Sequence, residues 1–206
     1  MSDIKSNLRN FYNLEAKHRN ANEKQDWKIA IRKAFCDLVL AENKKTLLEL
    51  GAGTGNDSVY FMDCGLEVLA VDLSSEMVKI CREKDVNSHE LDFYDIHTLR
   101  MKFDCVWAMN SLLHVPKADL NKVLRGIDNV LNENGLFYMG VYDGENKENE
   151  RVNDLCDIPR FFSFYCEEEI QKVLRDVFEI VHFEQFDVGR NVDFQSIVMR
   201  KKESKL

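Results

Sequence analysis

The feature that most constrains the fold of this sequence is a cluster of three glycines directly after a short apolar segment. Residues 46–50 (TLLEL) are largely apolar and suit a buried strand. Gly51, Gly53 and Gly55 follow at every second position. Glycines this close together destabilise the interior of a helix or strand, but they let a backbone turn sharply and pass close to a ligand. Residues 56–64 then carry apolar side chains at helical spacing, so the stretch predicts the strand, turn and helix that begin a nucleotide-binding unit.

An ordinary tight turn is the alternative interpretation of these glycines, and two further features favour a ligand site. Glu49 lies in an otherwise apolar strand end, where a carboxylate without a partner destabilises the fold. The spacing also differs from the dinucleotide fingerprint GxGxxG, because Asn56 stands where its last glycine would be. The phosphate-binding pattern GxxxxGK[ST] does not occur in the sequence. The carboxylate and the spacing therefore favour a binding turn of a different kind.

Polar residues also follow the later predicted strands. Asp72 closes a strand over 67–71 and lies about 20 residues beyond the first glycine, where Rossmann-like folds place an acid that binds ribose hydroxyls. The alternative is that Asp72 only caps the following helix. The same position after a strand is taken by Asp92 and Phe93 (strand 86–91) and by Asn110 (strand 103–109). Because the carboxyl ends of parallel strands meet at one edge of a sheet, we expect these residues to share one site.

The periodicity along the chain predicts five strands that alternate with helices, followed by one more helix and a pair of strands. The predicted strands are 46–50, 67–71, 86–91, 103–109, 136–142, 178–186 and 194–200, and the predicted helices include 23–41, 56–64 and 167–176. Asn22 is the expected N-cap of the helix over 23–41. Residues 1–22 are expected to form a short helix or a mobile arm. This order predicts an α/β fold, a Rossmann-like three-layer sandwich with a mostly parallel sheet.

The length and composition predict one domain with two segments around its site. The chain has 206 residues, of which 45% are hydrophobic, and this suits a single domain over residues 1–206. Residues 1–41 are expected to form an N-terminal helical cap. Residues 143–160 break the strand–helix pattern with dense charge, which predicts a lid, a binding loop or a disordered segment. With the aromatic residues that follow, residues 143–166 are expected to form a substrate lid.

Composition and charge disfavour several other classes of protein. The net charge of −8 argues against broad nucleic-acid binding, which needs a basic face. The sequence has no apolar run long enough for a bilayer and no signal-peptide core, so a cytoplasmic location without a membrane partner is expected. The six cysteines include no C-x-x-C pair, so they are interpreted as reduced core thiols and no metal site is expected. The terminal Ser204-Lys205-Leu206 matches a peroxisomal address, which is the alternative location.

Five segments of the sequence, taken in order, resemble the motifs of class I S-adenosylmethionine (SAM)-dependent methyltransferases. They are LLELGAGTG, VLAVDLSSEMV, ELDFYDI, FDCVWAMNSLLHVP and VLNENGLFYMGVY, and the resemblance covers roughly residues 40–200. The first motif alone is moderately specific, whereas the ordered set is highly specific for fold and cofactor but poorly specific for the substrate. The resemblance implies a seven-stranded sheet with an antiparallel last strand, and it implies SAM as the cofactor.

The resemblance also implies a set of cofactor-binding residues. These are Glu49, Gly51, Ala52, Gly53, Gly55, Asp72, Leu73, Met77, Asp92, Phe93 and Asn110. The glycine turn would let the backbone approach the methionine and ribose parts of SAM, and Glu49 would hold the methionine amino group. Asp72 would accept from the ribose hydroxyls, with Leu73 and Met77 near the adenine. Asp92 would accept from the adenine amino group beside Phe93, and Asn110 would lie at the methionine end.

On the acceptor side, a general base is needed only if the acceptor arrives protonated. His114 follows the fourth strand near the expected mouth of the site and is the candidate catalytic base. The alternative is a histidine that only packs at the start of the next helix. The candidate substrate-binding residues are Tyr12, Tyr142, Arg160 and Tyr165. Arg160 and the nearby Arg151 are candidates to pair with an anionic substrate, and the alternative is that both are solvated arginines on the surface.

The sequence therefore predicts an enzyme that transfers the sulfonium methyl of SAM to a small-molecule acceptor by in-line displacement. The string [ND]-P-P-[YF], typical of nucleic-acid and protein amino-methyltransferases, is missing, and residues 108–111 read AMNS in that region. Two alternatives stand beside this prediction: an NAD-dependent Rossmann oxidoreductase, and a non-catalytic SAM-binding sensor or partner module. A monomer or a homodimer is expected.

Overall fold

The computed structural model describes residues 2–153, 156–189 and 193–203, so the terminal Ser204–Leu206 motif lies outside the described residues. The helices are α1 (Ser2–Ala21), α2 (Asp26–Ala41), α3 (Asn56–Asp63), α4 (Ser75–Glu83), α5 (Lys117–Val130) and α6 (Glu167–Arg175). The strands are β1 (Thr46–Leu50), β2 (Glu67–Asp72), β3 (Ser88–Glu90), β4 (Phe103–Met109), β5 (Leu131–Tyr142), β6 (Glu148–Asn153), β7 (Cys156–Ser163), β8 (Phe178–Asp187) and β9 (Asp193–Lys201). Two short 3-10 helices are η1 (Phe93–Leu99) and η2 (Leu112–His114).

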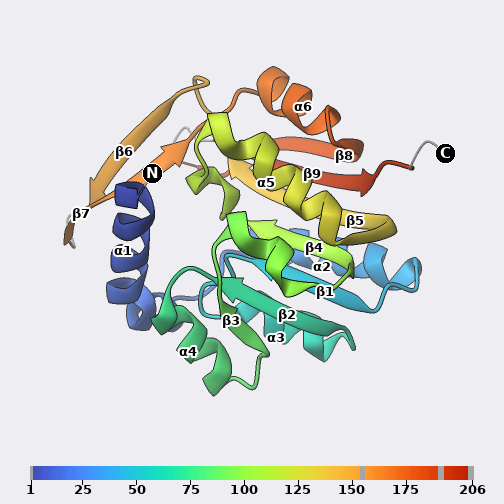
Figure 1. The fold of residues 1–206 in the computed structure, drawn as a ribbon, viewed down its shortest axis with the longest axis horizontal. Helices are drawn as coiled ribbons and strands as arrows, with labels where there is room; N and C mark the ends of the chain where they lie inside the picture. Colours follow the sequence, from blue (N-terminus) through green and yellow to red (C-terminus); the bar gives the residue numbers. More distant parts are fainter. Residues whose placement is uncertain (1, 154–155, 190–192, 204–206) are drawn as a thin grey trace.

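Seven of these strands form one sheet in the order β3-β2-β1-β4-β5-β9-β8, which confirms the predicted fold class (Figure 1). β1 pairs in parallel with both β2 and β4, and β4 pairs in parallel with β5. The last strand, β9, is antiparallel to its neighbours β5 and β8, as the resemblance implied. The strand order reverses direction at β1 and β4, and ligands of such sheets bind at the carboxyl ends of the strands near this point.

The central strands are mostly apolar because helices cover both faces of the sheet. Along β4, Cys105 and Trp107 belong to the cluster packed under α2 and α3, whereas Val106 and Ala108 belong to the cluster under α5 and α6. This alternation is the two-residue period of a strand. Trp107 also stacks on the ring of Tyr138, with 4.0 Å between the ring centroids. The run FDCVWAM is therefore a strand that is buried on both sides.

The glycine turn joins β1 to α3 as predicted. Gly51, Gly53 and Gly55 have φ angles of +68°, +56° and +75°, in the left-handed region that other residues rarely adopt. A Cβ on Gly51 would lie only 2.5 Å from the Cβ of Ser111, at the end of the neighbouring strand β4. The three glycines are therefore required by the geometry of the turn and, at Gly51, by its close packing.

The N-terminal segment is more regular than the short helix or mobile arm predicted for residues 1–22. It forms the 20-residue helix α1, which buries Leu8 and Phe11 on one face. A few apolar residues suffice for this helix because its other faces remain in solvent. Asn22 is not the N-cap of the next helix, since α2 begins only at Asp26.

Two strands have bounds that differ from the prediction by two residues or more at one end. β3 is limited to Ser88–Glu90, because the backbone N–H of Val86 donates instead to Cys81 and closes the end of α4. β5 begins at Leu131, earlier than the predicted residue 136, because Leu131 pairs with Phe103 before the register shifts. The carboxyl end of β5 is the predicted Tyr142, and that of β3 lies one residue before the predicted Leu91.

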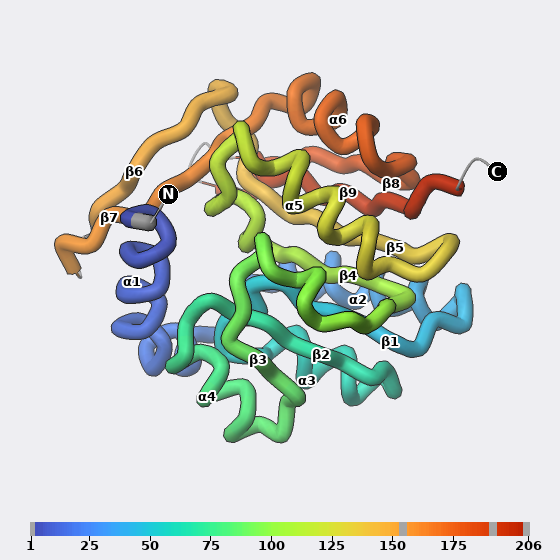
Figure 2. Tube along the Cα trace, viewed as in Figure 1, coloured from blue at the N-terminus to red at the C-terminus, as the bar shows by residue number. Residues whose placement is uncertain are grey.

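Residues 143–160 are not the unstructured connection that their charge suggested. β6 and β7 form an antiparallel hairpin that pairs Glu148 with Ser163 and Arg151 with Arg160. This hairpin forms its own two-stranded sheet, so its charged side chains need no place in the main core. α1 packs along β7, and both lie at the edge of the main sheet where the parallel strands end (Figures 1 and 2).

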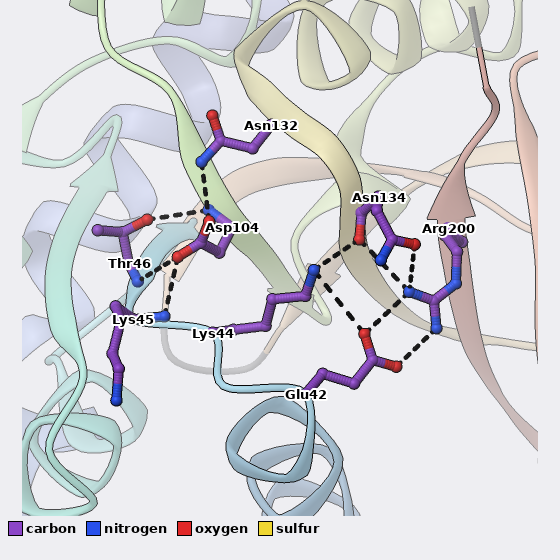
Figure 3. A network of polar contacts seen from close by, with 8 residues as sticks. All are labelled: Glu42, Lys44, Lys45, Thr46, Asp104, Asn132, Asn134 and Arg200. Carbon is purple, nitrogen blue, oxygen red and sulfur yellow. Dashed lines mark hydrogen bonds and ion pairs between the residues drawn. The ribbon is translucent and has the colours of Figure 1, made fainter.

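The amino-terminal end of the parallel strands is joined by a polar network (Figure 3). The Asp104 carboxylate accepts hydrogen bonds from the backbone N–H groups of Lys45 and Thr46, at 2.8 and 3.1 Å. The Arg200 guanidinium forms a two-pronged ion pair with Glu42, at 2.9 and 2.6 Å. These contacts connect β1, β4, α2 and β9, and they leave the opposite end of the sheet for a ligand.

The structure also bears on disulfides, metal sites and membrane-spanning helices. The six cysteines all lie in the described residues, and none of them forms a disulfide. Within residues 2–153, 156–189 and 193–203, no cluster of His, Cys, Asp and Glu side chains is arranged to hold a metal ion. None of the helices in the same residues has the length and apolar character needed to cross a membrane.

Candidate active site

A cavity of about 510 Å³ lies between the carboxyl ends of β1, β2 and β4, helix α1 and strand β7. Most residues predicted from the sequence line it: Tyr12, Glu49, Gly51, Ala52, Gly53, Asp72, Leu73, Met77, Phe93, Asn110, His114, Tyr142 and Arg160. They come from strand ends, loops, two helices and the hairpin. The fold therefore brings side chains that lie far apart in the sequence together in the wall of one cavity.

Three predicted residues lie outside this wall. Gly55 lets α3 start close to α4, because a Cβ there would lie 2.9 Å from a side chain of that helix. Asp92 borders a neighbouring cavity of about 40 Å³ and forms an ion pair with Lys5, at 2.7 Å. Tyr165 is buried under Lys117, whose Nζ lies 4.3 Å from the ring centroid. Packing, rather than a place in the cavity, accounts for Tyr165.

Glu49 is one of the buried carboxyl groups of the wall, at 4% exposure. It accepts a short hydrogen bond from the hydroxyl of Ser58, which is the partner that its burial requires. Burial, with a further contribution from the nearby Asp57 carboxylate, raises the pKa of Glu49 to about 8. A carboxyl group in this state gains stability when a cation is placed beside it.

Asp72 joins the turn to the end of β2. Its Oδ2 accepts from the backbone N–H of Gly53 and its Oδ1 from that of Ser74, each at 2.8 Å. The side chain of Ser74, and not that of Asp72, caps α4 by accepting from the N–H of Met77 at 3.2 Å. Burial raises the pKa of Asp72, although the two backbone hydrogen bonds act in the opposite direction. Each carboxylate oxygen can accept a further hydrogen bond.

Asn110 occupies a strained position at the end of β4. Its φ is +55°, in the left-handed region, and its backbone N–H donates to the carbonyl of Gly140 at 2.9 Å. The side-chain Oδ1 is buried and has no hydrogen-bond partner among the described residues. Strained backbone and an unpaired polar atom are features that gather at ligand sites.

Tyr12 from α1 and His114 from η2 form a hydrogen-bonded pair in the wall. The Nδ1 of His114 lies 2.7 Å from the carbonyl oxygen of Phe161, which can only accept, so Nδ1 carries the hydrogen. The other ring nitrogen, Nε2, therefore accepts from the Tyr12 hydroxyl, at 2.6 Å. Two hydrogen bonds thus fix the ring, its tautomer and the position of the phenol.

The pKa values of this pair are shifted in opposite directions. Burial and, to a smaller extent, the positive charges of Arg160 and Arg19 together lower the pKa of His114 to about 4, so the ring is neutral at pH 7. Burial raises the pKa of Tyr12, and the same two arginines reduce that rise. At pH 7 the Nε2 lone pair is therefore unprotonated and accepts the hydrogen bond of the neutral phenol.

Several cations of the wall were not found from the sequence. Arg19, Lys24 and Lys28 line the cavity from α1, α2 and the connection between them. Lys24 is held by Asp57, which also pairs with Arg32 at 2.9 Å. Burial lowers the pKa of Lys28 to about 8, with smaller contributions from the neighbouring cations. No strand-end pattern marks these residues, so only the packing of α1 and α2 against the sheet reveals them.

Two groups of lining residues differ in chemistry. One group comprises the backbone of the glycine turn, the Asp72 carboxylate, and apolar surface from Leu73 and Phe93. Carboxylate acceptors and apolar flanks suit the ribose and base of a nucleoside. The other group is the hydrogen-bonded Tyr12–His114 pair. The cavity can therefore hold a nucleoside together with a second, proton-bearing molecule.

Comparisons with known proteins find methyltransferases. A family model described as a methyltransferase domain matches residues 47–135. An uncharacterised methyltransferase of Oceanobacillus iheyensis is 26% identical over 174 residues, which cover 80% of each chain.

Two solved structures are similar over nearly the whole chain. The 1,6-didemethyltoxoflavin-N1-methyltransferase of Burkholderia thailandensis, with bound S-adenosylhomocysteine (SAH), has a TM-score of 0.72 at 21% identity and covers 96% of this chain and 88% of its own. The magnesium protoporphyrin IX methyltransferase of Synechocystis, with bound SAM, has a TM-score of 0.73 at 15% identity and covers 97% and 98%. Both structures share the fold of this chain.

Proposed function

The chain is a class I SAM-dependent methyltransferase, and on this basis we propose that it methylates a small-molecule acceptor inside the 510 Å³ cavity. The observation that carries the proposal is that the Tyr12–His114 pair lines the same cavity as the glycine turn and Asp72. In this proposal the N-terminal cap (1–41) and the lid (143–166) enclose the acceptor. The methyltransferase family and the SAM-bound and SAH-bound neighbours favour SAM over NAD and an enzyme over a non-catalytic sensor.

The residues on the glycine-turn side fit SAM, which supplies a methyl group on a sulfonium when it is bound. A Cβ on Gly53 would meet no heavy atom within 4 Å, so the backbone here borders open space that a ligand can approach. The unpaired Oδ1 of Asn110 would accept from the methionine ammonium group. Asp72 would accept from the ribose hydroxyls while keeping its two backbone hydrogen bonds.

In this proposal, charged residues near the cavity also contact SAM. Glu49 would pair with the methionine ammonium group. This pairing would stabilise the ionised form of the Glu49 carboxyl, whose pKa is raised to about 8 by burial. Arg19 and Lys28 would face the methionine carboxylate. Asp92 would bind the adenine amino group by sharing its carboxylate with Lys5.

We assign the removal of the acceptor proton to Tyr12 and His114. An O–H or N–H of the acceptor would give its proton to the phenolic oxygen of Tyr12, and the Tyr12 proton would pass to Nε2 of His114 along the existing 2.6 Å hydrogen bond. The Phe161 carbonyl would hold the resulting imidazolium in place through Nδ1. The surrounding aromatic residues would exclude water from this step.

The test is SAH formation from SAM with a cell metabolite extract as the source of acceptor. We expect His114→Gln and Tyr12→Phe each to lower the rate by about 100-fold or more, with SAM affinity unchanged, because general base catalysis contributes on this scale. His97→Gln, which changes an exposed histidine of η1, is the matched control. A wild-type protein that forms no SAH, or variants that keep the full rate, would contradict the proposal.

A further inference from the structure

Arg160 is a cation of the cavity wall without a carboxylate partner. It lies on β7 and faces the cavity that also contains Tyr12 and His114. Among residues 2–153, 156–189 and 193–203, no Asp or Glu forms an ion pair with it, and its buried Nε has no hydrogen-bond partner. A partly buried guanidinium without an anion beside it destabilises the fold, so the presence of Arg160 in the cavity wall needs an explanation.

Two aromatic rings hold the guanidinium in one orientation. Its central carbon lies 4.2 Å from the ring centroid of Phe11 and 5.1 Å from that of Phe162. Stacking on aromatic faces orients a planar guanidinium and leaves its N–H edge for a ligand. The side chain is thus fixed on α1 and β7 and is not the solvated surface arginine that the sequence allowed.

The buried acids of the cavity already have partners. Glu49 is bonded to Ser58, Asp57 is paired with Lys24 and Arg32, and Asp72 accepts from two backbone N–H groups. Tyr12 and His114 carry no negative charge at neutral pH, since the pKa of the phenol is raised and the imidazole is neutral. The positive charge of Arg160 is therefore left for a molecule that enters the cavity.

We propose that the methyl acceptor carries a carboxylate or phosphate group and that Arg160 binds this group as a specificity-determining residue. The inference rests on the proposed function, because the bound anion would place the nucleophile of the acceptor beside Tyr12. The guanidinium fork matches the two oxygens of a carboxylate or phosphate. Neutralising Arg160 would also remove one of the charges that depress the pKa of His114, so the anionic acceptor would strengthen the base that deprotonates it.

The hairpin supplies a matched control. Arg151 is the register partner of Arg160 across β6 and β7, and it also stacks on an aromatic ring, with 4.6 Å to the centroid of Phe164. Arg151 is exposed and does not line the cavity. Replacing either arginine removes one positive charge and two contacts with aromatic rings, but only Arg160 faces the cavity.

The experiment measures the binding of three probes to SAH-saturated protein by calorimetry: benzoate, phenyl phosphate and the neutral benzamide. In the wild type we expect at least one anion to bind about tenfold or more tightly than benzamide, because a charge-assisted pair contributes on this scale. Arg160→Gln is expected to remove this preference, Arg160→Lys to keep part of it, and Arg151→Gln to keep all of it. The anion that binds more tightly distinguishes a phosphate from a carboxylate as the preferred group.

Three results would overturn the proposal: equal binding of all probes to the wild type, an unchanged preference in Arg160→Gln, or a tenfold loss of SAH affinity in that variant. The last result would make the cofactor, not the acceptor, the partner of Arg160. SAH formation with the metabolite extract is measured separately. Anion preference without any SAH formation would leave the Arg160 site in place while contradicting the proposed methyl transfer.

Discussion

His114 shows how the fold sets the chemistry of a single side chain. One ring nitrogen of His114 donates to the Phe161 carbonyl and the other accepts from the Tyr12 hydroxyl, so the two hydrogen bonds fix both the orientation of the ring and its tautomer. The sequence alone identified His114 as a candidate base because it follows a strand end. It did not reveal that Tyr12, about 100 residues earlier in the chain, is its partner, because α1 reaches the site only through tertiary packing.

The depressed pKa of His114 predicts a pH dependence of stability. An unfolded chain binds a proton at His114 near pH 6.5, whereas the native ring binds it only near pH 4, since burial and the charges of Arg160 and Arg19 oppose it. Between these values the unfolded state holds more protons, so this contribution to stability is lost as the pH falls from about 6.5 to 4. Urea unfolding at several pH values should show a steeper loss below pH 6.5 in wild type than in His114→Gln.

His97→Gln serves as the control for this measurement, because His97 is exposed and lies outside the cavity. Its unfolding curve should keep the wild-type slope between pH 4 and 6.5. A His114→Gln protein with the same slope as wild type would show that His114 is protonated alike in both states, and it would remove the basis for a neutral ring at the site.

At the scale of elements, the glycine turn is the part of the site that sequence specifies most completely. The left-handed φ angles of Gly51, Gly53 and Gly55 require glycine, and the apolar strand and helix on either side follow from their periodicity. The hairpin β6–β7 is the opposite case. Its strands pair with each other outside the main sheet, so charge and not alternation dominates their sequence, and a lid, binding loop or disordered segment was predicted where a hairpin forms.

Replacing Gly53 or Gly51 by alanine is expected to lower the free energy of unfolding by different amounts. Gly53→Ala should cost about 1 kcal/mol of unfolding free energy from the left-handed φ alone, because no heavy atom lies within 4 Å of its Cβ. Gly51→Ala should cost roughly 1–3 kcal/mol more, because its Cβ would overlap Ser111 at 2.5 Å. Urea unfolding of both variants without SAM measures the difference directly.

The same pair of variants separates folding from binding. Gly53→Ala should weaken SAM binding despite its modest effect on stability, because its methyl group would enter the space that we assign to the cofactor. Equal stability of the two variants would contradict the packing described at Gly51. Undiminished SAM affinity in Gly53→Ala would contradict the placement of the cofactor beside the turn.

At the scale of the whole molecule, the strand order and the edge that carries the site followed from the alternation of strands and helices. The strands end together at one edge, and the opposite edge is occupied by the network around Asp104 and Arg200 (Figure 3). A cap over residues 1–41 and a lid over residues 143–166 were predicted from the sequence, but the packing of α1 along β7 was not, because it joins distant parts of the chain. The sequence therefore offered candidate residues for the acceptor side without their contacts, whereas the cofactor side was largely visible in the motifs.

The central claim is that one cavity holds SAM at the glycine turn and an acceptor at the Tyr12–His114 pair. A crystal structure of the protein with bound SAH tests it most directly. We predict that the ribose hydroxyls donate hydrogen bonds to Asp72 and that the sulfur faces Tyr12 and His114. Ribose hydroxyls bound elsewhere, or a sulfur that points away from that pair, would contradict the account.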